Sequence, residues 1–256
     1  MNTFDPHGQI QRIAIVGCGG TGSQVARSVA RMLYDMQQSR QQTPRLLLID
    51  PDTVEMKNVG RQLFTPADVG QFKAQVLMQR FNLALGLDAV VIPEAVNVEK
   101  HLPERGNLVI GCVDNHLARR ELAKAEGTVW IDAGNHASSG QVVIGNTSDA
   151  DLLQRNLTPL HGIYRYLPNA ARVFPQLLEP DDTPQPQASC AENVVANTQD
   201  LLINDWLAIV VSQYVYKLLH RQPITSHMTY ISADSMGVRS VAICRDELLP
   251  YLQVEV

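Results

Sequence analysis

The sequence predicts an α/β protein with a mainly parallel central sheet, helices on both faces of that sheet, and antiparallel strands that close one edge. Three features support this prediction. Apolar strand runs at 13–16 and 46–49 are separated by a helical pattern, as in a β-α-β unit. A glycine-rich turn, GCGGTGS, joins the first run to that helix. The end of the chain carries two further strand runs, 229–232 and 238–243, around a turn at Gly237.

The glycine turn fits a phosphate-binding loop. Its glycines are Gly17, Gly19, Gly20 and Gly22, directly after the first strand and at the start of the helix. This spacing permits a tight turn and a close approach of phosphate oxygens to the backbone, and the free N–H groups of a helix start favour anions. The same pattern occurs in nicotinamide and flavin proteins, and a purely structural turn is also compatible with it. The turn alone therefore predicts a nucleotide without naming which one.

The second strand and the loop after it narrow the choice. The run 46–49 ends at Asp50, whose carboxylate can accept hydrogen bonds from both hydroxyls of a ribose. Several polar residues follow it: Asp52, Asn58, Arg61 and Gln62, with Lys73 at the start of the next helix. A guanidinium and an ammonium suit a triphosphate better than a nicotinamide ring, because both bind phosphate oxygens and offset the charge that develops on them. A plain surface lysine is the alternative interpretation of Lys73.

The later strands bring more polar residues to the same edge of the sheet. Strands are predicted at 90–92, 108–110 and 128–131, with a short helix over 98–105 and a helix start at 65–68. The run 108–110 leads to Asp114, which can hold a Mg²⁺ ion that bridges a triphosphate, or can cap the helix that starts near His116. The small residues of DAGNHASSGQ, 132–141, indicate close approach of the backbone to a ligand or partner before an antiparallel strand at 142–144.

The segment 149–189 lacks periodicity, and its prolines exclude long regular elements. Cys190 follows at the junction with a long helical pattern. A thiol at a helix N-terminus can gain thiolate character, and a small buried residue is the alternative interpretation. Cys18, Cys112 and Cys244 are interpreted as small packing residues.

Composition and charge exclude several classes of function. Of the 256 residues, 45% are hydrophobic and 18% are charged, and the net charge is −5 with no basic block. We therefore expect a soluble globular protein without general affinity for nucleic acid or membranes. Neither a signal pattern nor a membrane-spanning run is present, which predicts a cytoplasmic location. The four cysteines are widely spaced and form no C-x-x-C pair, so neither a disulfide framework nor zinc is expected.

Three motifs, in this order, resemble the ThiF/MoeB/HesA family, the bacterial relatives of ubiquitin-activating enzymes. The motifs are GCGGTGS, DPDTVEMKNVGRQ and DVGQFK, and the resemblance is looser in the second half of the chain. It implies a Rossmann-like fold in one ThiF-like domain over 1–256. A nucleotide-binding core is expected over 1–135, a crossover or lid loop that receives the partner's tail over 149–190, and the C-terminal helix with the closing strands over 191–256.

The resemblance also implies a reaction. ATP would adenylate the C-terminal glycine carboxylate of a small ubiquitin-like or sulfur-carrier protein, with an acyl-adenylate and pyrophosphate as products, and ATP and Mg²⁺ are the implied cofactors. By motif, the implied ATP site comprises Gly17, Gly19, Gly20, Gly22, Asp50, Asn58, Arg61, Lys73, Asp114 and Asn115. Arg61, Lys73 and Asp114 are the implied catalytic residues, with Asp114 on Mg²⁺. Some relatives capture the partner as a thioester or persulfide on a cysteine near the position of Cys190, which makes Cys190 a further catalytic candidate.

The chain departs from the family in two places. The R-Y-x-R-Q arm, which in relatives sends an arginine into the partner subunit's site, is missing from MNTFDPHGQIQR, and Val59-Gly60 replaces the more usual Leu-Gln. A homodimer is still the expected state. Length and the pattern SCAE…QDLLIN look most similar to ThiF-like proteins of PRTRC plasmid gene sets. Two alternatives stay open: a catalytically silent scaffold for a ubiquitin-like protein or partner subunit, and an NAD-dependent oxidoreductase, which the cations after Asp50 disfavour.

Overall fold

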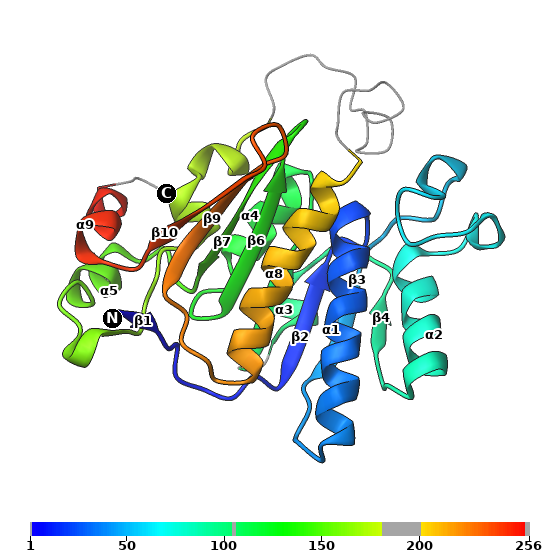
Figure 1. Ribbon diagram of the computed structural model, residues 1–256, viewed down its shortest axis with the longest axis horizontal. Coiled ribbons are helices and arrows are strands. Elements are labelled where there is room, and N and C mark those ends of the chain that lie inside the picture. Colours follow the sequence, from blue (N-terminus) through cyan, green and yellow to red (C-terminus); the bar gives the residue numbers. More distant parts are fainter. Residues whose placement is uncertain (1, 104–105, 181–200, 254–256) are drawn as a thin grey trace.

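An eight-stranded sheet runs through the protein, with strand order β10-β9-β7-β6-β5-β2-β3-β4 (Figure 1). The computed structural model describes residues 2–103, 106–180 and 201–253. The strands β4, β3, β2, β5 and β6 are parallel, and β7, β9 and β10 continue the sheet in antiparallel fashion. Their bounds are β2 Arg12–Val16, β3 Arg45–Ile49, β4 Val90–Ile92, β5 Asn107–Gly111, β6 Val129–Asn135, β7 Ser139–Gly145, β9 Ser226–Ser232 and β10 Gly237–Ala242. The predicted fold class is thus confirmed.

Helices cover both faces of the sheet because alternate residues of each buried strand point to opposite faces. Ile13 and Ile15 belong to one hydrophobic cluster, whereas Ala14 and Val16 belong to another. The first cluster includes the helices α1 Gly20–Gln38, α2 Lys73–Leu85 and α8 Ile203–Leu219. The second includes α3 Val98–His101, α4 His116–Ala123 and α6 Ala170–Val173.

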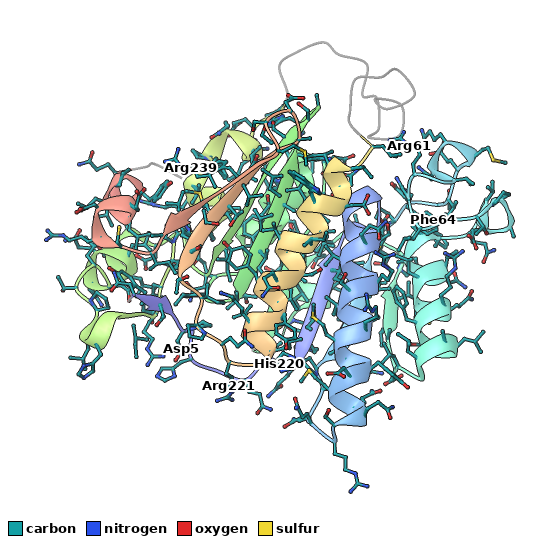
Figure 2. The ribbon with its side chains drawn as sticks, in the orientation of Figure 1. Asp5, Arg61, Phe64, His220, Arg221 and Arg239 are labelled. Atoms are coloured by element: carbon teal, nitrogen blue, oxygen red, sulfur yellow. The ribbon has the colours of Figure 1, made fainter. Side chains whose placement is uncertain are left out.

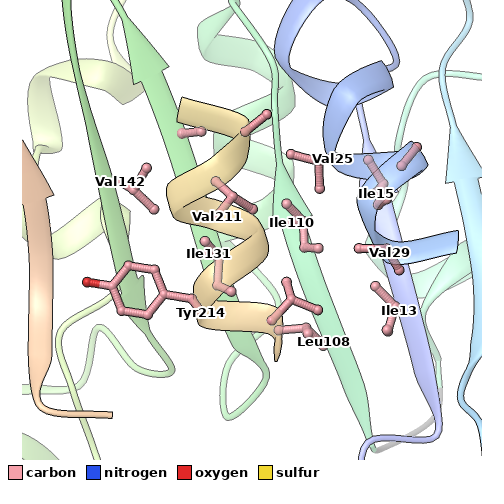
Figure 3. Packing of buried hydrophobic residues seen from close by; sticks show 14 of the residues in the cluster. Ile13, Ile15, Val25, Val29, Leu108, Ile110, Ile131, Val142, Val211 and Tyr214 are labelled. Carbon is pink, nitrogen blue, oxygen red and sulfur yellow. The ribbon is translucent and has the colours of Figure 1, made fainter. Parts of the chain in front are cut away.

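The cluster under α1 and α8 fixes the position of both helices on the sheet (Figure 3). The two helices pack side by side, although they are far apart in the sequence. Val25 of α1 and Val211 of α8 are fully buried there, as is Ile110 of β5. Burial of one such side chain contributes about 1.5–3 kcal/mol, so the cluster holds the N-termini of both helices at the same edge of the sheet.

The helix start predicted at 65–68 is wrong. A single 3-10 turn, η2 Pro66–Asp68, occupies these residues, and the α-helix begins only at Lys73. The Asp68 carboxylate accepts hydrogen bonds from the Thr65 backbone N–H at 2.6 Å and from its hydroxyl at 2.8 Å, and it pairs with Arg80. Gly70 then takes a left-handed φ of +88°, which ends the turn before a helix can propagate.

The small residues of 132–141 belong to a strand pair, because they continue β6 and begin β7. Strand β6 continues to Asn135 because residues 132–135 pair with β7, as in Ala133↔Val142. A Cβ on Gly140 would lie 2.8 Å from the backbone oxygen of Gly134 and from the side chain of Leu207 in α8. These two glycines therefore admit a neighbouring strand and a helix, so the interpretation of close approach to a ligand is wrong for them.

The segment after β7 contains short elements, as its prolines predict. They are α5 Ala150–Arg155, η3 Leu160–Gly162, β8 Ile163–Tyr164, α6 and η4 Pro175–Leu178. Strand β1, Thr3–Phe4, pairs in parallel with β8, and α9 Arg245–Leu248 and η5 Leu249–Leu252 follow β10. Residues 181–200, which include Cys190 and part of the predicted lid, lie outside the described residues.

Within the part of the chain that is described, no helix combines the length and apolar character that a membrane span needs.

His227 makes the stability of the fold dependent on pH. The side chain is fully buried, its Nε2 lies 2.8 Å from the carbonyl oxygen of Pro168, and its Nδ1 has no hydrogen-bond partner among the described residues. Burial lowers the pKa of His227 to about 4, and the bond to Pro168 opposes this shift. The unfolded chain binds the proton first, at a pKa of about 6.5, so this contribution is complete above that pH and is lost as the pH falls towards the folded-state pKa.

We expect the free energy of unfolding to fall by about 3 kcal/mol between neutral pH and pH 4 through this residue. Urea unfolding across this range measures it, and in His227→Gln the fall should be smaller by that amount. His136→Gln is the control, because His136 is exposed. The same pH dependence in His227→Gln and the wild type would contradict the assignment.

Candidate functional site

A cavity of about 670 Å³ lies at the carboxyl ends of the parallel strands. It is lined by residues that follow β2, β3, β4 and β5 and by the end of β6, namely Gly17, Asp50, Ala95, Cys112 and Ala133. After β2 and α1 the chain enters β3 on one side, and after β4 it crosses to β5 on the other side of β2. In open α/β sheets, ligands bind at such a reversal of strand order.

The glycine turn is held in a conformation that side chains would prevent. Gly17 has a φ of +87°, and a Cβ there would lie 2.4 Å from the Cys112 carbonyl oxygen. A Cβ on Gly22 would lie 1.8 Å from the Gly17 carbonyl oxygen. For Gly19, by contrast, the nearest atom is Gln62 Nε2 at 3.8 Å, so its missing side chain leaves space in the cavity. Gly17 and Gly22 shape the turn, and Gly19 keeps it open.

Asp50 connects the turn to the end of β3. Its carboxylate accepts the backbone N–H of Cys18 at 2.5 Å and that of Asp52 at 2.8 Å. Burial raises the pKa of Asp50, while these two N–H groups and the Lys73 ammonium favour the ionised form. Because each carboxylate oxygen carries two lone pairs, the group retains acceptor capacity on the side that lines the cavity.

Lys73 is the first residue of α2 and also lines the cavity. Its side chain is 9% exposed, and Nζ lies 2.8 Å from Oδ2 of Asp52, whose side chain is 64% exposed. An ammonium paired with an exposed carboxylate can exchange that partner for phosphate oxygens at little cost. The interpretation as a plain surface lysine is therefore wrong, because the residue is buried.

Asp114 is exposed and lines the cavity after β5. Its alternative role as a helix cap is wrong: the N-cap of α4 is Asn115, whose Oδ1 accepts the Ala118 N–H at 2.8 Å. Among the described residues, no hydrogen bond or ion pair engages the Asp114 carboxylate. It can therefore serve as a metal ligand together with oxygens from a substrate.

The cavity brings together most of the predicted site residues: Gly17, Gly19, Gly20, Asp50, Asn58, Lys73, Asp114 and Asn115. Gly22 and Arg61 do not line it. Arg61 is half-buried on the loop between η1, Met56–Asn58, and η2, beyond the N-terminal end of α2 (Figure 2). Cys190 lies outside the described residues.

The surroundings of Cys18 and Cys112 disfavour a reactive thiolate. The pKa of the Cys18 thiol is raised by burial and by Asp50, and that of Cys112 by burial and by Asp132. Both thiols stay protonated near neutral pH and are poor nucleophiles, which agrees with their interpretation as packing residues.

A trio of polar residues at the cavity wall is missing from the sequence-based prediction. Asn204, in the first turn of α8, accepts hydrogen bonds on Oδ1 from the Thr21 hydroxyl at 2.9 Å and from Asn135 Nδ2 at 2.8 Å. All three residues line the cavity. Asn204 is 6% exposed and contacts the glycine turn. In the sequence, the signal for such a role was a polar residue within an apolar helical pattern.

Fold and cavity together define a doubly wound α/β protein with its ligand site at the reversal of strand order. The chain belongs to the ThiF family, which it matches over residues 9–247. Over 152 residues it is 31% identical to ubiquitin-like modifier-activating enzyme 5 of Oryza sativa subsp. japonica, covering 51% of this chain and 34% of that protein. The Arabidopsis thaliana protein of the same name is 29% identical over 155 residues, with 51% and 34% covered. The chain thus spans about a third of the length of these relatives.

Solved structures share the fold at lower identity. E. coli MccB with AMPCPP and selenomethionine MccA has a TM-score of 0.59 and 16% identity, covering 92% of this chain and 64% of that chain. E. coli MccB with ATP has a TM-score of 0.57 and 17% identity, with 92% and 64% covered.

Proposed function

We propose that this protein uses ATP to adenylate the C-terminal carboxylate of a polypeptide. Family membership supports this reaction class, and two sets of relatives supply the acceptor class: some are named as ubiquitin-like modifier-activating enzymes, and MccB has been crystallised with MccA and AMPCPP. The observation that carries the proposal is the arrangement of Asp50, Lys73 and Asp114 around the glycine turn in one cavity.

Each part of the nucleotide has matching chemistry in the cavity. Val96 and Leu117 offer apolar surface for the base on the side of β4 and α4. Asp50 accepts the ribose hydroxyls, and the turn at the start of α1 presents backbone N–H groups to the phosphates. Lys73 exchanges Asp52 for a phosphate oxygen. Asn58 is 2% exposed and accepts the Glu55 N–H on Oδ1 at 2.8 Å, so its side chain is fixed beside the phosphates.

The reaction forms one bond and breaks one. A carboxylate oxygen of the acceptor attacks the α-phosphorus of ATP, and the bond from that phosphorus to the bridging oxygen breaks as pyrophosphate leaves with the electron pair. No proton is transferred, so the site needs positioning and charge neutralisation, and no general base. Lys73 offsets the charge on the phosphate oxygens, and we infer the same role for Arg61, whose loop neighbours Asn58 and Gln62 line the cavity.

Mg²⁺ fits the cavity as a companion of ATP. No cluster of three metal-binding side chains exists among the described residues, so the protein alone offers no complete metal cage. Mg²⁺ is commonly held by one or two carboxylates together with substrate phosphates, and Asp114 is a carboxylate of that kind. When bound, the ion would withdraw charge from the phosphate oxygens.

A thermal-shift experiment separates the proposed activity from its two alternatives. ATP with Mg²⁺ at 100 times its Kd should stabilise the protein by about 2.7 kcal/mol, and NAD should leave it unchanged. Stabilisation by NAD alone would favour an oxidoreductase, and stabilisation by neither would favour a silent scaffold.

Finer assignments belong to the same proposal. We infer that the acceptor is a small protein that ends in glycine, of ubiquitin-like or sulfur-carrier type. We also infer that the protein is a homodimer, and analytical ultracentrifugation measures this oligomeric state. Thioester formation at Cys190 would leave a thiol-sensitive adduct that Cys190→Ala lacks. Membership of the PRTRC subgroup stays a prediction, and the neighbouring genes test it.

A further inference from the structure

The cavity extends from the ends of β3 and β4 to the end of β6. In the proposed placement, the ribose lies at the end of β3 and the phosphates at the turn after β2, which leaves the section over β6 for another group. Neighbouring strands lie about 4.8 Å apart, so β3 and β6, which are three strand positions apart, are separated by about 14 Å. The wall of this outer section contains Asn135 and Asn204.

The Asn204 amide packs against the glycine turn and lines the cavity. Its oxygen is occupied by the Thr21 hydroxyl and by Asn135 Nδ2, at 2.9 Å and 2.8 Å. The nitrogen Nδ2 and the carbon Cγ lie 2.8 Å and 2.9 Å from the position that a Cβ on Gly20 would take, so the amide group packs against the glycine turn. Among the described residues, no acceptor engages Nδ2. A side chain only 6% exposed and fixed by two donors is a preorganised hydrogen-bond donor.

We propose that Asn204 orients the acceptor's terminal carboxylate for attack, by donating a hydrogen bond from Nδ2 to the carboxylate oxygen that does not attack. This inference rests on the proposed adenylation and names the residue that receives the second substrate. The phosphates already meet the helix N-terminus and Lys73 on the β2 and β3 side, whereas an acceptor must approach from the section that they leave empty. Asn135 and Thr21 act through Asn204, as positioning residues.

A pair of unreactive ligands isolates the acyl group. The first is 5′-O-sulfamoyladenosine, and the second is the same molecule with a glycylglycyl group on the sulfamate, which mimics the acyl-adenylate. Titration calorimetry on the full chain gives both dissociation constants. The wild type should bind the acylated ligand at least about tenfold more tightly, and in Asn204→Ala this ratio should fall to about 2 or less, since one preorganised bond is lost.

Two further variants complete the design. Thr21→Val preserves shape, leaves Asn204 in place and removes one of its two anchors, so the ratio should fall by about threefold. If Asn204→Ala fails to fold, the ratio measured for Thr21→Val tests the proposal in its place. Asp205→Ala changes the next residue of α8, which does not line the cavity, and should keep the wild-type ratio.

The outcomes separate the two proposals. An unchanged ratio in both Asn204→Ala and Thr21→Val, or equal weakening of both ligands, overturns the role of Asn204 while adenylation stands. A wild type that binds neither ligand, or that gains nothing from the acyl group, overturns the proposed adenylation, and the role of Asn204 with it.

Discussion

Asp114→Ala is expected to abolish the dependence of ATP binding on Mg²⁺ and to lower acceptor-dependent ATP–pyrophosphate exchange by about 100-fold or more. Asp114 is exposed, lines the cavity and has no ionic partner among the described residues. Its removal therefore takes away a ligand for the cation without loss of a structural contact. The free energy of unfolding should stay within about 0.5 kcal/mol of the wild-type value.

Calorimetric titration of ATP with and without Mg²⁺ measures the first effect, and exchange with a peptide that ends in Gly-Gly measures the second. Asp88→Ala is the matched control. Asp88 is also exposed, and its carboxylate pairs with the Arg45 guanidinium at 2.9 Å. It precedes the amino end of β4, whereas the cavity lies at the carboxyl ends of the parallel strands. An Mg²⁺ dependence as strong in Asp114→Ala as in the wild type would remove Asp114 from the metal site.

The part of the site that depends on local sequence could be predicted. Asp50 follows a continuous apolar run, and parallel strands bring their carboxyl ends to one edge, so its position followed from the pattern alone. Lys73 and Asp114 were located in the same way, each directly after a loop or strand at that edge. These residues line one cavity in the structure.

The conformation of the loop after β3 could not be predicted, because two side-chain caps and one glycine determine it. The Glu55 and Asn58 pair closes η1, the Thr65 and Asp68 pair closes η2, and Gly60 between them has a left-handed φ of +78°. Asn58 and Gln62 therefore line the cavity while Arg61, between them in sequence, does not.

Asn204 was missed for a different reason. Its hydrogen bond to Thr21 joins residues 183 positions apart, and the contact exists because α1 and α8 pack side by side on one face of the sheet. From the sequence, Asn204 is one polar residue within an apolar helix. Tertiary packing gives it a function that periodicity does not indicate.

Gly22→Ala is expected to destabilise the fold by about 4 kcal/mol or more. The new Cβ would lie 1.8 Å from the Gly17 carbonyl oxygen. The backbone fixes the position of Cβ, and the oxygen is itself a backbone atom, so no side-chain rotation relieves the contact and the turn has to open. Opening also strains the hydrogen bond from the Gly17 N–H to the Ile49 carbonyl at 2.9 Å, which ties the turn to β3. Urea unfolding measures the loss.

Gly19→Ala tests the same turn without the collision. Its Cβ would meet nothing closer than 3.8 Å, and the cost should be about 1 kcal/mol, because alanine is a poorer N-cap than glycine for α1. The added methyl group nevertheless enters the space that we assign to the phosphates, so the affinity for ATP should fall by about tenfold. The two variants thus separate stability from binding within one turn. Equal stability of Gly22→Ala and the wild type would contradict the turn geometry, whereas unchanged ATP affinity in Gly19→Ala would place the phosphates elsewhere.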